Sequence, residues 1–129
     1  MKQIGKEEFL QKVFNFEKST WWKYEGIKPC IVDFHADWCG PCRTLEPILE
    51  DLAKKYEEQI LVYKVDTEKE KDLCAAFGIK SLPTVLFCPL GGRPQVVAGA
   101  LPYETIEKAI QDVLIKSIED AKRPKKVGW

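Results

Sequence analysis

The chain has 129 residues, enough for one domain with a hydrophobic core, and its composition of 45% hydrophobic and 31% charged residues is that of an ordinary globular protein. Twenty basic residues balance twenty acidic ones, so no net field favours a nucleic-acid partner, and no apolar run approaches the roughly 20 residues that a membrane-spanning helix needs. Five cysteines are an odd and modest number, which argues against a secreted disulfide scaffold.

The N-terminal part predicts one helix and one long loop. Residues 6–17 place their apolar side chains in a single helical stripe, formed by Phe9, Leu10, Val13 and Phe14. In the loop over 19–29, we expect three aromatic residues to pack over an edge of the core, namely Trp21, Trp22 and Tyr24. The start of the chain is amphipathic and acidic and lacks the apolar segment of a signal peptide. This predicts a cytoplasmic protein, or a periplasmic one if a leader had been removed.

The middle of the chain alternates a strand with a helix. Residues 30–36 form a nearly continuous apolar run, which predicts a central strand buried on both faces. A helix is expected from Pro41, where the missing N–H of proline is not needed, to Tyr56, on a stripe of apolar residues. Pro47 falls inside this helix and is expected to bend it.

The remaining elements complete an α/β pattern. Three further strands are predicted at 59–66, 83–88 and 95–99. Two further helices are predicted at 69–77, closed by Gly78, and at 103–121. This order predicts helices on both faces of a sheet, with parallel strands first and an antiparallel hairpin last. We expect one domain over 1–121 and a basic, flexible tail over 122–129.

Cys39 and Cys42 stand three positions apart, at the junction between the buried strand and the helix that follows it. Such positions lie on one face of a helix, so the two sulfur atoms can form a small reversible disulfide ring. Free N–H groups and the dipole at a helix start favour a thiolate, which is the nucleophile of thiol chemistry. Trp38 would shield the pair, and Gly40 would let the backbone of a partner approach closely. The pattern predicts a redox-active dithiol.

Other roles for the cysteines have less support. A structural zinc site usually needs four ligands, but Cys74 and Cys88 are fourteen positions apart and His35 stands alone, so we expect no metal. A chance CxxC spacing would not be expected both to follow a buried strand and to open an amphipathic helix. Cys30, Cys74 and Cys88 have apolar neighbours, and we expect them to be buried thiols that act as small hydrophobic side chains.

Asp33 and His35 are the ionisable residues of the buried strand. A buried carboxylate is costly to charge, so the pKa of Asp33 should be raised. Two interpretations stay open: Asp33 accepts the proton of Cys42 when that thiol attacks a mixed disulfide, or it is hydrogen-bonded or solvated and has no role. Histidine changes charge readily near neutral pH, but the strand neighbours of His35 favour packing over tuning of the cysteines, and tuning over direct catalysis.

Four segments together resemble the thioredoxin family: DFHADWCGPC at 33–42, the helix that contains Pro47, GIKSLPT at 78–84 and AGAL at 98–101. The resemblance covers about 30–121, and its WCGPC motif is highly specific. It implies the thioredoxin fold, an α/β architecture with a central mixed sheet of four to five strands flanked by helices on both faces. It also implies a cis-proline at Pro83 and a strand-like pairing of the backbone at Leu82 with an extended substrate segment. The substrate-contacting residues that it implies are Trp38, Gly40, Pro41, Leu82, Pro83, Gly99 and Ala100.

The resemblance further implies a protein-disulfide reductase, that is, a thiol–disulfide oxidoreductase. The Cys39 thiolate would attack a disulfide of a target protein, and Cys42, helped by Asp33, would resolve the mixed disulfide and leave a Cys39–Cys42 disulfide. We expect no bound cofactor, since in the family electrons come from NADPH through a thioredoxin reductase. The expected partners are disulfide-containing target proteins and that reductase, with no nucleic acid and no membrane, and the expected state is a monomer.

Two alternatives to a general reductase remain. One is a dedicated periplasmic or pathway-specific oxidoreductase or isomerase of the same fold, although such proteins tend to carry a histidine between the cysteines, where Gly40 and Pro41 stand here. The other is a non-catalytic thioredoxin-like binding subunit, which would have no need of an intact cysteine pair. Three features depart from the family: His35 replaces a tryptophan of many bacterial members, the first strand is hardly visible, and the N-terminal region is longer than usual.

Overall fold

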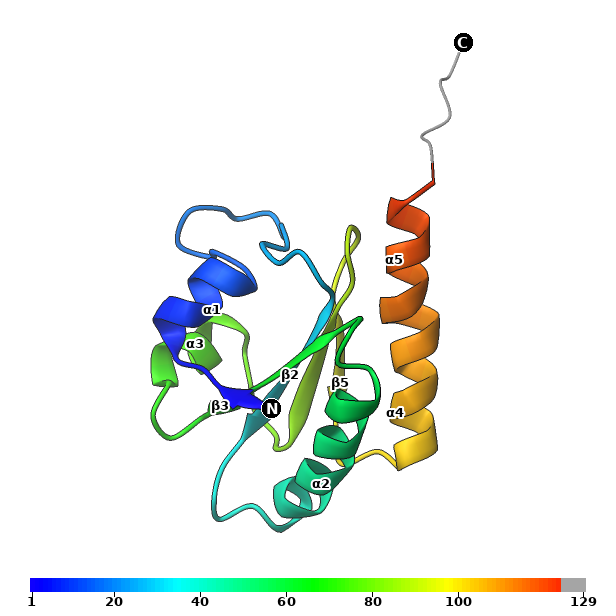
Figure 1. The fold of residues 1–129 in the computed structure, drawn as a ribbon. Coiled ribbons are helices and arrows are strands. Elements are labelled where there is room, and N and C mark those ends of the chain that lie inside the picture. The colour runs from blue at the N-terminus through cyan, green and yellow to red at the C-terminus, as the bar shows by residue number, and fades with distance from the viewer. Residues whose placement is uncertain (124–129) are drawn as a thin grey trace.

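A computed structural model describes residues 1–123, and Figure 1 shows its fold. A five-stranded mixed sheet lies at the centre, in the order β1-β3-β2-β4-β5. The strands are β1 (Lys2–Gln3), β2 (Cys30–His35), β3 (Leu61–Asp66), β4 (Thr84–Cys88) and β5 (Gln95–Ala98). The helices are α1 (Lys6–Lys12), α2 (Gly40–Lys55), α3 (Lys71–Ala76), α4 (Tyr103–Ala109), the π-helical segment η1 (Ile110–Ile115) and α5 (Lys116–Ala121). The predicted α/β class with a mixed central sheet is confirmed.

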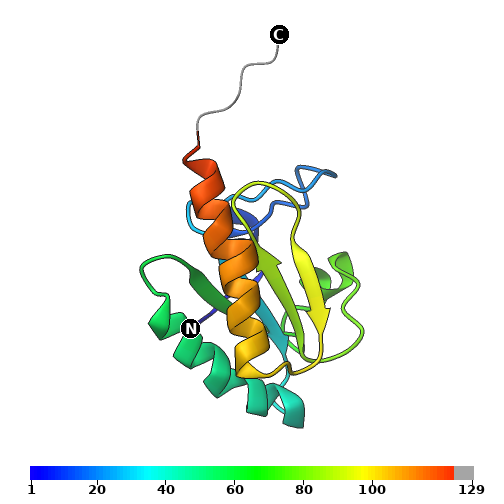
Figure 2. The same ribbon diagram turned by 90° about the vertical axis from the view of Figure 1, so that its right-hand side faces the viewer.

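The middle strand of the sheet is β2, and all of its residues are buried. It pairs in parallel with β3 and antiparallel with β4, and β4 forms the antiparallel hairpin with β5 that the sequence predicts. Helices α1 and α3 cover one face of the sheet, whereas α2 and the long C-terminal helix cover the other (Figure 1 and Figure 2). A strand covered on both faces needs apolar residues at successive positions, which explains the apolar run in this part of the sequence.

Successive side chains of β2 enter two different cores. Val32 and Phe34 belong to the core under α1 and α3, whereas Ile31 packs with the buried leucines of α2. Asp33 and His35 alternate with Val32 and Phe34 along the strand. They therefore lie on the α2 face, like Ile31. The fold thus places two ionisable side chains under the helix that begins beside the cysteine pair.

Helix α2 begins where the sequence predicts and has Pro41 in its first turn. Its buried side chains follow the predicted stripe and are Cys42, Leu45, Leu49 and Leu52. The helix continues through Pro47, where the ring removes one backbone hydrogen bond. The bend expected at Pro47 stays a prediction.

The first helix is shorter than predicted, because α1 ends at Lys12. Its apolar stripe is buried as expected. Beyond the helix, the side-chain oxygen of Asn15 accepts hydrogen bonds from the N–H groups of Glu17 and Lys18, both at 3.2 Å. An asparagine that binds the backbone in this way stabilises a turn in place of another helical turn.

The aromatic residues of the long N-terminal loop differ in their exposure. Trp22 packs on Phe14 with ring centroids 4.7 Å apart, and Tyr24 packs against the same core. Trp21 is 80% exposed, so the prediction that it packs was wrong. A local turn explains the difference, because the Ser19 hydroxyl donates to the carbonyl of Trp21 at 2.8 Å and accepts from its N–H at 3.1 Å.

The prediction of one continuous C-terminal α-helix was wrong, because the middle segment η1 is π-helical. Hydrogen bonds in a π-helix span five residues and widen the helix locally. After this segment, the Ser117 hydroxyl donates to the carbonyl of Leu114 at 2.6 Å and accepts from the N–H of Leu90 at 3.0 Å. Ser117 is therefore the buried residue of this turn, where the predicted apolar stripe placed Ile118.

Gly78 follows α3 in the left-handed region, with a φ of 61°. Its N–H donates to the carbonyl of Ala75 at 3.1 Å, and the N–H of Ile79 donates to the carbonyl of Cys74 at 3.0 Å, which closes the helix as predicted. We expect Gly78→Ala to lower the free energy of unfolding in urea by about 1 kcal/mol, because a β-carbon is strained in this conformation. Gly40→Ala is the matched control, since a β-carbon there meets nothing within 4 Å. Equal losses in the two variants would contradict the prediction.

The chain beyond α5 is described only as far as Arg123. Most of the predicted flexible tail, residues 124–129, lies outside the described residues. Over residues 1–123, no helix combines the length and the apolar character needed to cross a membrane.

Candidate active site

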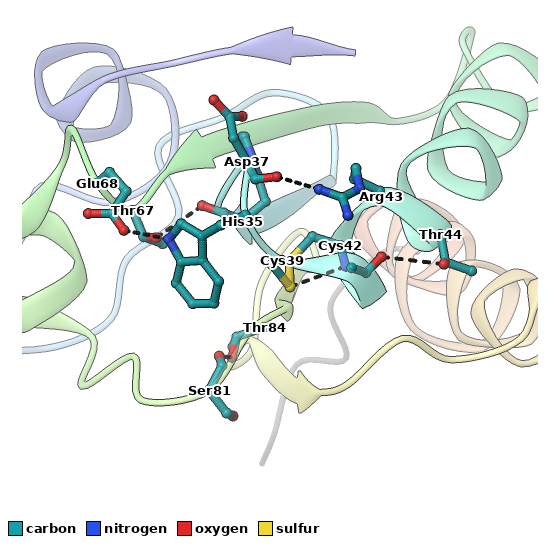
Figure 3. The surroundings of a disulfide bond; sticks show 12 residues. His35, Asp37, Cys39, Cys42, Arg43, Thr44, Thr67, Glu68, Ser81 and Thr84 are labelled. Atoms are coloured by element: carbon teal, nitrogen blue, oxygen red, sulfur yellow. Dashed lines mark hydrogen bonds between the residues drawn. A yellow bond between two sulfur atoms is a disulfide. The ribbon is translucent and has the colours of Figure 1, made fainter.

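Cys39 and Cys42 form a disulfide at the start of α2 (Figure 3). Their Cα atoms are 5.3 Å apart, within the usual range for disulfides. Cys39 is the N-cap residue of α2, and its sulfur atom accepts a hydrogen bond from the N–H of Cys42 at 3.3 Å. The predicted position of Cys39 at a helix start is therefore confirmed. After reduction of the bond, the N–H groups of this turn favour a thiolate at Cys39.

One side of the cysteine pair is an open surface. Trp38 is 68% exposed, and its indole N–H donates to Glu68 at 2.6 Å, which fixes the ring beside the disulfide (Figure 3). Gly40 and Pro41 are exposed in the first helical turn. Arg43 donates to the carbonyl of Asp37 at 2.8 Å and ties the helix to the preceding loop. A partner protein can approach Cys39 across this surface without displacing a side chain at Gly40.

The other side of the pair is formed by the segment before β4. The peptide bond between Leu82 and Pro83 is cis, as the resemblance implies. Leu82 packs against the two cysteines, and the carbonyl of Pro83 accepts a hydrogen bond from the N–H of Gly99 at 2.8 Å. Gly99 has a φ of 99°, in the region that favours glycine, and Ala100 follows it as an exposed residue. The structure thus brings together, around one disulfide, residues from three distant parts of the sequence.

A groove of about 390 Å³ adjoins this site on the side of α3. It runs between Trp38 and Leu82 and is lined by both apolar and charged side chains. The residues that line it are Trp38, Thr67, Glu68, Lys71, Cys74, Ala75, Ile79, Lys80 and Leu82. Its position next to Cys39 makes it suitable for the chain segment that flanks a target cysteine.

Asp33 is 1% exposed on the α2 face of β2. Its Oδ1 atom is buried and has no hydrogen-bond partner among the residues that the structure describes. The pKa of Asp33 is raised to about 7, mainly by burial and also by the nearby carboxylate of Glu46, whereas the ammonium group of Lys64 opposes the rise. The raised pKa that the sequence predicts is confirmed. A carboxyl group with this pKa can both accept and release a proton near neutral pH.

Two residues beside Asp33 are absent from the sequence-based prediction of the site. Lys64 of β3 is the register partner of Asp33, and its ammonium group binds Glu46 of α2 at 2.7 Å. The hydrogen bond to Lys64 lowers the pKa of Glu46 and keeps it ionised. A signal was available, because Glu46 stands four positions after Cys42 and therefore shares its helix face. No sequence pattern, however, pairs Lys64 with Asp33.

His35 is the last residue of β2 and is 9% exposed. Its carbonyl accepts hydrogen bonds from the N–H and the hydroxyl of Thr67, at 2.9 and 3.0 Å, which hold the end of the strand (Figure 3). Its Nε2 atom is buried and has no hydrogen-bond partner within the described part of the chain. Buried polar atoms are rarely left without a partner, so packing alone does not account for the Nε2 atom of His35.

The three remaining cysteines lie away from the disulfide. Cys30 and Cys88 are buried, as predicted, and are register partners across β2 and β4. Cys74 is only half-buried, because it lines the groove beside Trp38, so the prediction of a fully buried thiol was wrong for this residue. Burial raises the pKa of both Cys74 and Cys88, which keeps these thiols protonated and weakly nucleophilic.

A buried aspartate, a dithiol at a helix start and a cis-proline segment packed against it define a protein of thiol–disulfide exchange. Comparison with known proteins identifies the family. The sequence model of the family Thioredoxin matches residues 6–112. The thioredoxin of Borreliella burgdorferi is 49% identical over 109 residues, which are 84% of this chain and 93% of that protein. The chloroplastic M-type thioredoxin of Spinacia oleracea is 37% identical over 109 residues, which are 83% of this chain and 60% of that protein.

A solved structure agrees with the sequence comparisons. The crystal structure of chloroplastic thioredoxin z superposes with a TM-score of 0.73 at 26% sequence identity, over 86% of this chain and 91% of that one. The chain belongs to the thioredoxin family, whose members are protein-disulfide reductases. It is therefore a thiol–disulfide oxidoreductase, and nothing in the comparisons favours a purely oxidising or a non-catalytic relative.

Proposed function

We propose that the protein reduces disulfides in target proteins, with Cys39 as the attacking thiolate, Cys42 as the resolving thiol and Asp33 as the proton acceptor for Cys42. The observation that carries this assignment is the N-cap position of Cys39, whose sulfur accepts an N–H of the helix beside an open surface. Cys42 lies on the buried face of α2, toward the sheet that carries Asp33. Both cysteines are buried, so they differ by position: Cys39 at the N-cap suits attack, and Cys42 on the sheet side of the helix suits resolution.

The reaction has two exchange steps. The Cys39 thiolate attacks one sulfur of the target disulfide, a mixed disulfide forms, and the other target sulfur leaves as a thiolate. Cys42 then gives its proton to the Asp33 carboxylate and attacks the sulfur of Cys39. The bond between Cys39 and the target breaks, and its electron pair leaves with the target sulfur. The target disulfide has gained two electrons, and the protein has become the disulfide form seen in the structure.

We assign target contact to the residues around Cys39. The exposed ring of Trp38 and the open turn at Gly40 and Pro41 offer a flat surface on one side. The segment Leu82–Pro83, with Gly99 and Ala100 beside it, forms the other side, where an extended target segment can align as an added strand. Support comes from the packing of Leu82 on the cysteines and from the adjoining groove.

The wider setting of the reaction is also part of the proposal. We place the protein in the cytoplasm, where thiols are kept reduced, as a monomeric single domain over 1–121. The dithiol would be restored by a thioredoxin reductase that uses NADPH. Support for this route is the membership in a family whose reaction needs an external electron donor and whose members act on disulfide targets.

The reduction potential of the Cys39–Cys42 pair tests a reductase against an oxidant of the same fold. We expect a value of about −270 mV, as in reducing members, because Gly40 and Pro41 between the cysteines add no charge that stabilises the thiolate further. Equilibration with glutathione or dithiothreitol buffers, followed by thiol labelling, measures it. A value near about −120 mV would identify an oxidant and refute the reductase assignment.

A further inference from the structure

Ionisable side chains form two adjacent rungs on the α2 face of the sheet. Asp33 of β2 is the register partner of Lys64 of β3, and two positions further His35 is the register partner of Asp66. All four residues share the face of the sheet that α2 covers, because they have the same strand parity as Ile31 and Val62 of that core. Asp33, His35 and Asp66 are buried, at 1%, 9% and 6% exposure. We call these four residues and Glu46 of α2 the polar cluster.

Within the polar cluster, most polar groups already have partners. Lys64 is held by Glu46 at 2.7 Å, and Oδ1 of Asp66 accepts the N–H of Glu68 at 2.9 Å. Two buried atoms of the polar cluster have no hydrogen-bond partner within residues 1–123, namely Oδ1 of Asp33 and Nε2 of His35. Buried polar atoms are seldom left unpaired, so two such atoms on one strand face point to a water that bridges them.

The separation of these two residues suits a proton path. Alternate residues on one face of a strand have Cα atoms about 6.6 Å apart, a gap that one bridging water can span between a carboxyl group and an imidazole. His35 stands on the side of Asp33 that leads toward Cys39, at the end of β2. Cys42 and Glu46 share one face of α2, so the polar cluster lies on the side to which Cys42 is buried.

We propose that His35 is a positioning residue for the resolution step: His35 receives from Asp33 the proton that Cys42 has released. This role of His35 rests on the proposed role of Asp33. The Cys42 S–H bond breaks, the proton goes to Asp33, and the sulfur bonds to Cys39 while the target leaves. The Asp33 carboxyl proton then passes to Nε2 of His35, which restores the carboxylate, and the imidazolium returns its proton to water or to the departing target thiolate.

The other members of the polar cluster do not suit this role. Lys64 is protonated, and its hydrogen bond with Glu46 raises its pKa further, so it has no lone pair to offer. The same bond lowers the pKa of Glu46, which makes its carboxylate a weak base. His35 carries a ring nitrogen that can accept a proton, and an imidazolium there would be near two carboxylates, those of Asp66 and Glu46. The charged or titratable groups placed around His35 by the register of β2 and β3 and by α2 are Asp33, Lys64, Asp66 and Glu46.

Single-turnover kinetics separates this role from packing. In His35→Phe, which keeps an aromatic ring but no basic nitrogen, we expect resolution of the mixed disulfide to slow by about tenfold near neutral pH, while its formation is unchanged. Asp33→Asn should also slow resolution more than formation, and His35→Phe should add little in the Asp33→Asn background, because both variants interrupt one path. Stopped-flow measurements between about pH 5.5 and 9 give both rates and their pH profiles.

The outcomes distinguish the two assignments. Slow resolution in Asp33→Asn together with a wild-type rate and pH profile in His35→Phe would overturn the role of His35 and leave that of Asp33 intact. A His35→Phe variant that slows formation and resolution alike would show a packing role and also overturn the inference. Unchanged resolution in Asp33→Asn would instead refute the proposed function of Asp33, on which the inference rests.

A second test keeps His35 unchanged and therefore does not depend on the folding of His35→Phe. His35 is the only histidine of the chain, so its imidazole NMR signals need no assignment. We expect the pH at which these signals titrate to fall by at least about 0.5 unit in reduced Asp33→Asn, because the imidazolium loses a neighbouring carboxylate. Asp37→Asn is the matched control at an exposed aspartate on the following loop. Identical titrations in wild type, Asp33→Asn and Asp37→Asn would overturn the coupling of His35 to Asp33.

Discussion

Cys39→Ser should reduce insulin disulfides with dithiothreitol no faster than the protein-free reaction does. A serine hydroxyl is not ionised at neutral pH, so the N-cap position that favours a thiolate at Cys39 has no nucleophile to stabilise. Wild-type protein should accelerate the reaction strongly, because Cys39 attacks insulin and Cys42 releases it. The turbidity of the precipitating insulin chain measures the rate. A Cys39→Ser variant as fast as wild type would refute the mechanism at its first step.

The remaining cysteines supply the controls for this experiment. Cys74→Ser makes the same chemical change at a half-buried thiol with a raised pKa, and it should keep the wild-type rate. Cys42→Ser should also be inactive, but for another reason: it forms the mixed disulfide and cannot resolve it. Mass spectrometry should then find insulin bound to Cys39 in Cys42→Ser and no adduct in Cys39→Ser. An adduct at Cys74 in either variant would identify Cys74 as an attacking thiol and would contradict the mechanism.

The parts of the fold that the sequence predicts correctly are those that depend on local sequence patterns. The apolar run of β2, the stripe of α2 and the glycine that closes α3 each reflect neighbours in the chain, and the structure has each where it is predicted. Side-chain hydrogen bonds to the backbone accompany the end of α1 and the exposure of Trp21, and similar bonds of Ser117 follow the π-helical segment. Apolar periodicity gives no information about these hydrogen bonds, so a prediction based on it makes the first helix and the C-terminal helix too regular.

The same division holds for the active site. The sequence alone indicates the chemistry of Cys39 and Cys42, because their spacing and their place before a helix are local. It also predicts a raised pKa at Asp33, because burial, its largest cause, follows from the apolar strand. The charges of Glu46 and Lys64, which modify that pKa in opposite directions, come from two other elements. Only the parallel register of β2 and β3 brings Lys64 and Asp66 into one cluster with Asp33 and His35.

Asp33→Asn should stabilise the oxidised protein at alkaline pH and leave it nearly unchanged in acid. The folded state raises the pKa of Asp33 from 3.8 to about 7, so it disfavours the ionised form. This group therefore costs no stability below about pH 4, and folding becomes less favourable as pH rises toward 7. A shift of about three units corresponds to about 4 kcal/mol at pH 8, which asparagine should recover because it carries no charge to bury. Urea unfolding at about pH 3.5 and pH 8 measures the difference.

A second aspartate separates this effect from a general loss of negative charge. Asp37→Asn removes a carboxylate from the exposed loop before the cysteines and should change the free energy of unfolding by less than about 0.5 kcal/mol at either pH. A gain in Asp33→Asn that is equal at both pH values would contradict a cause in ionisation. If the gain appears only at pH 8 and the same variant resolves mixed disulfides slowly, then the buried carboxylate lowers stability and serves the reaction at one position. Its retention in a strand that would otherwise be entirely apolar up to His35 then has a chemical reason rather than a structural one.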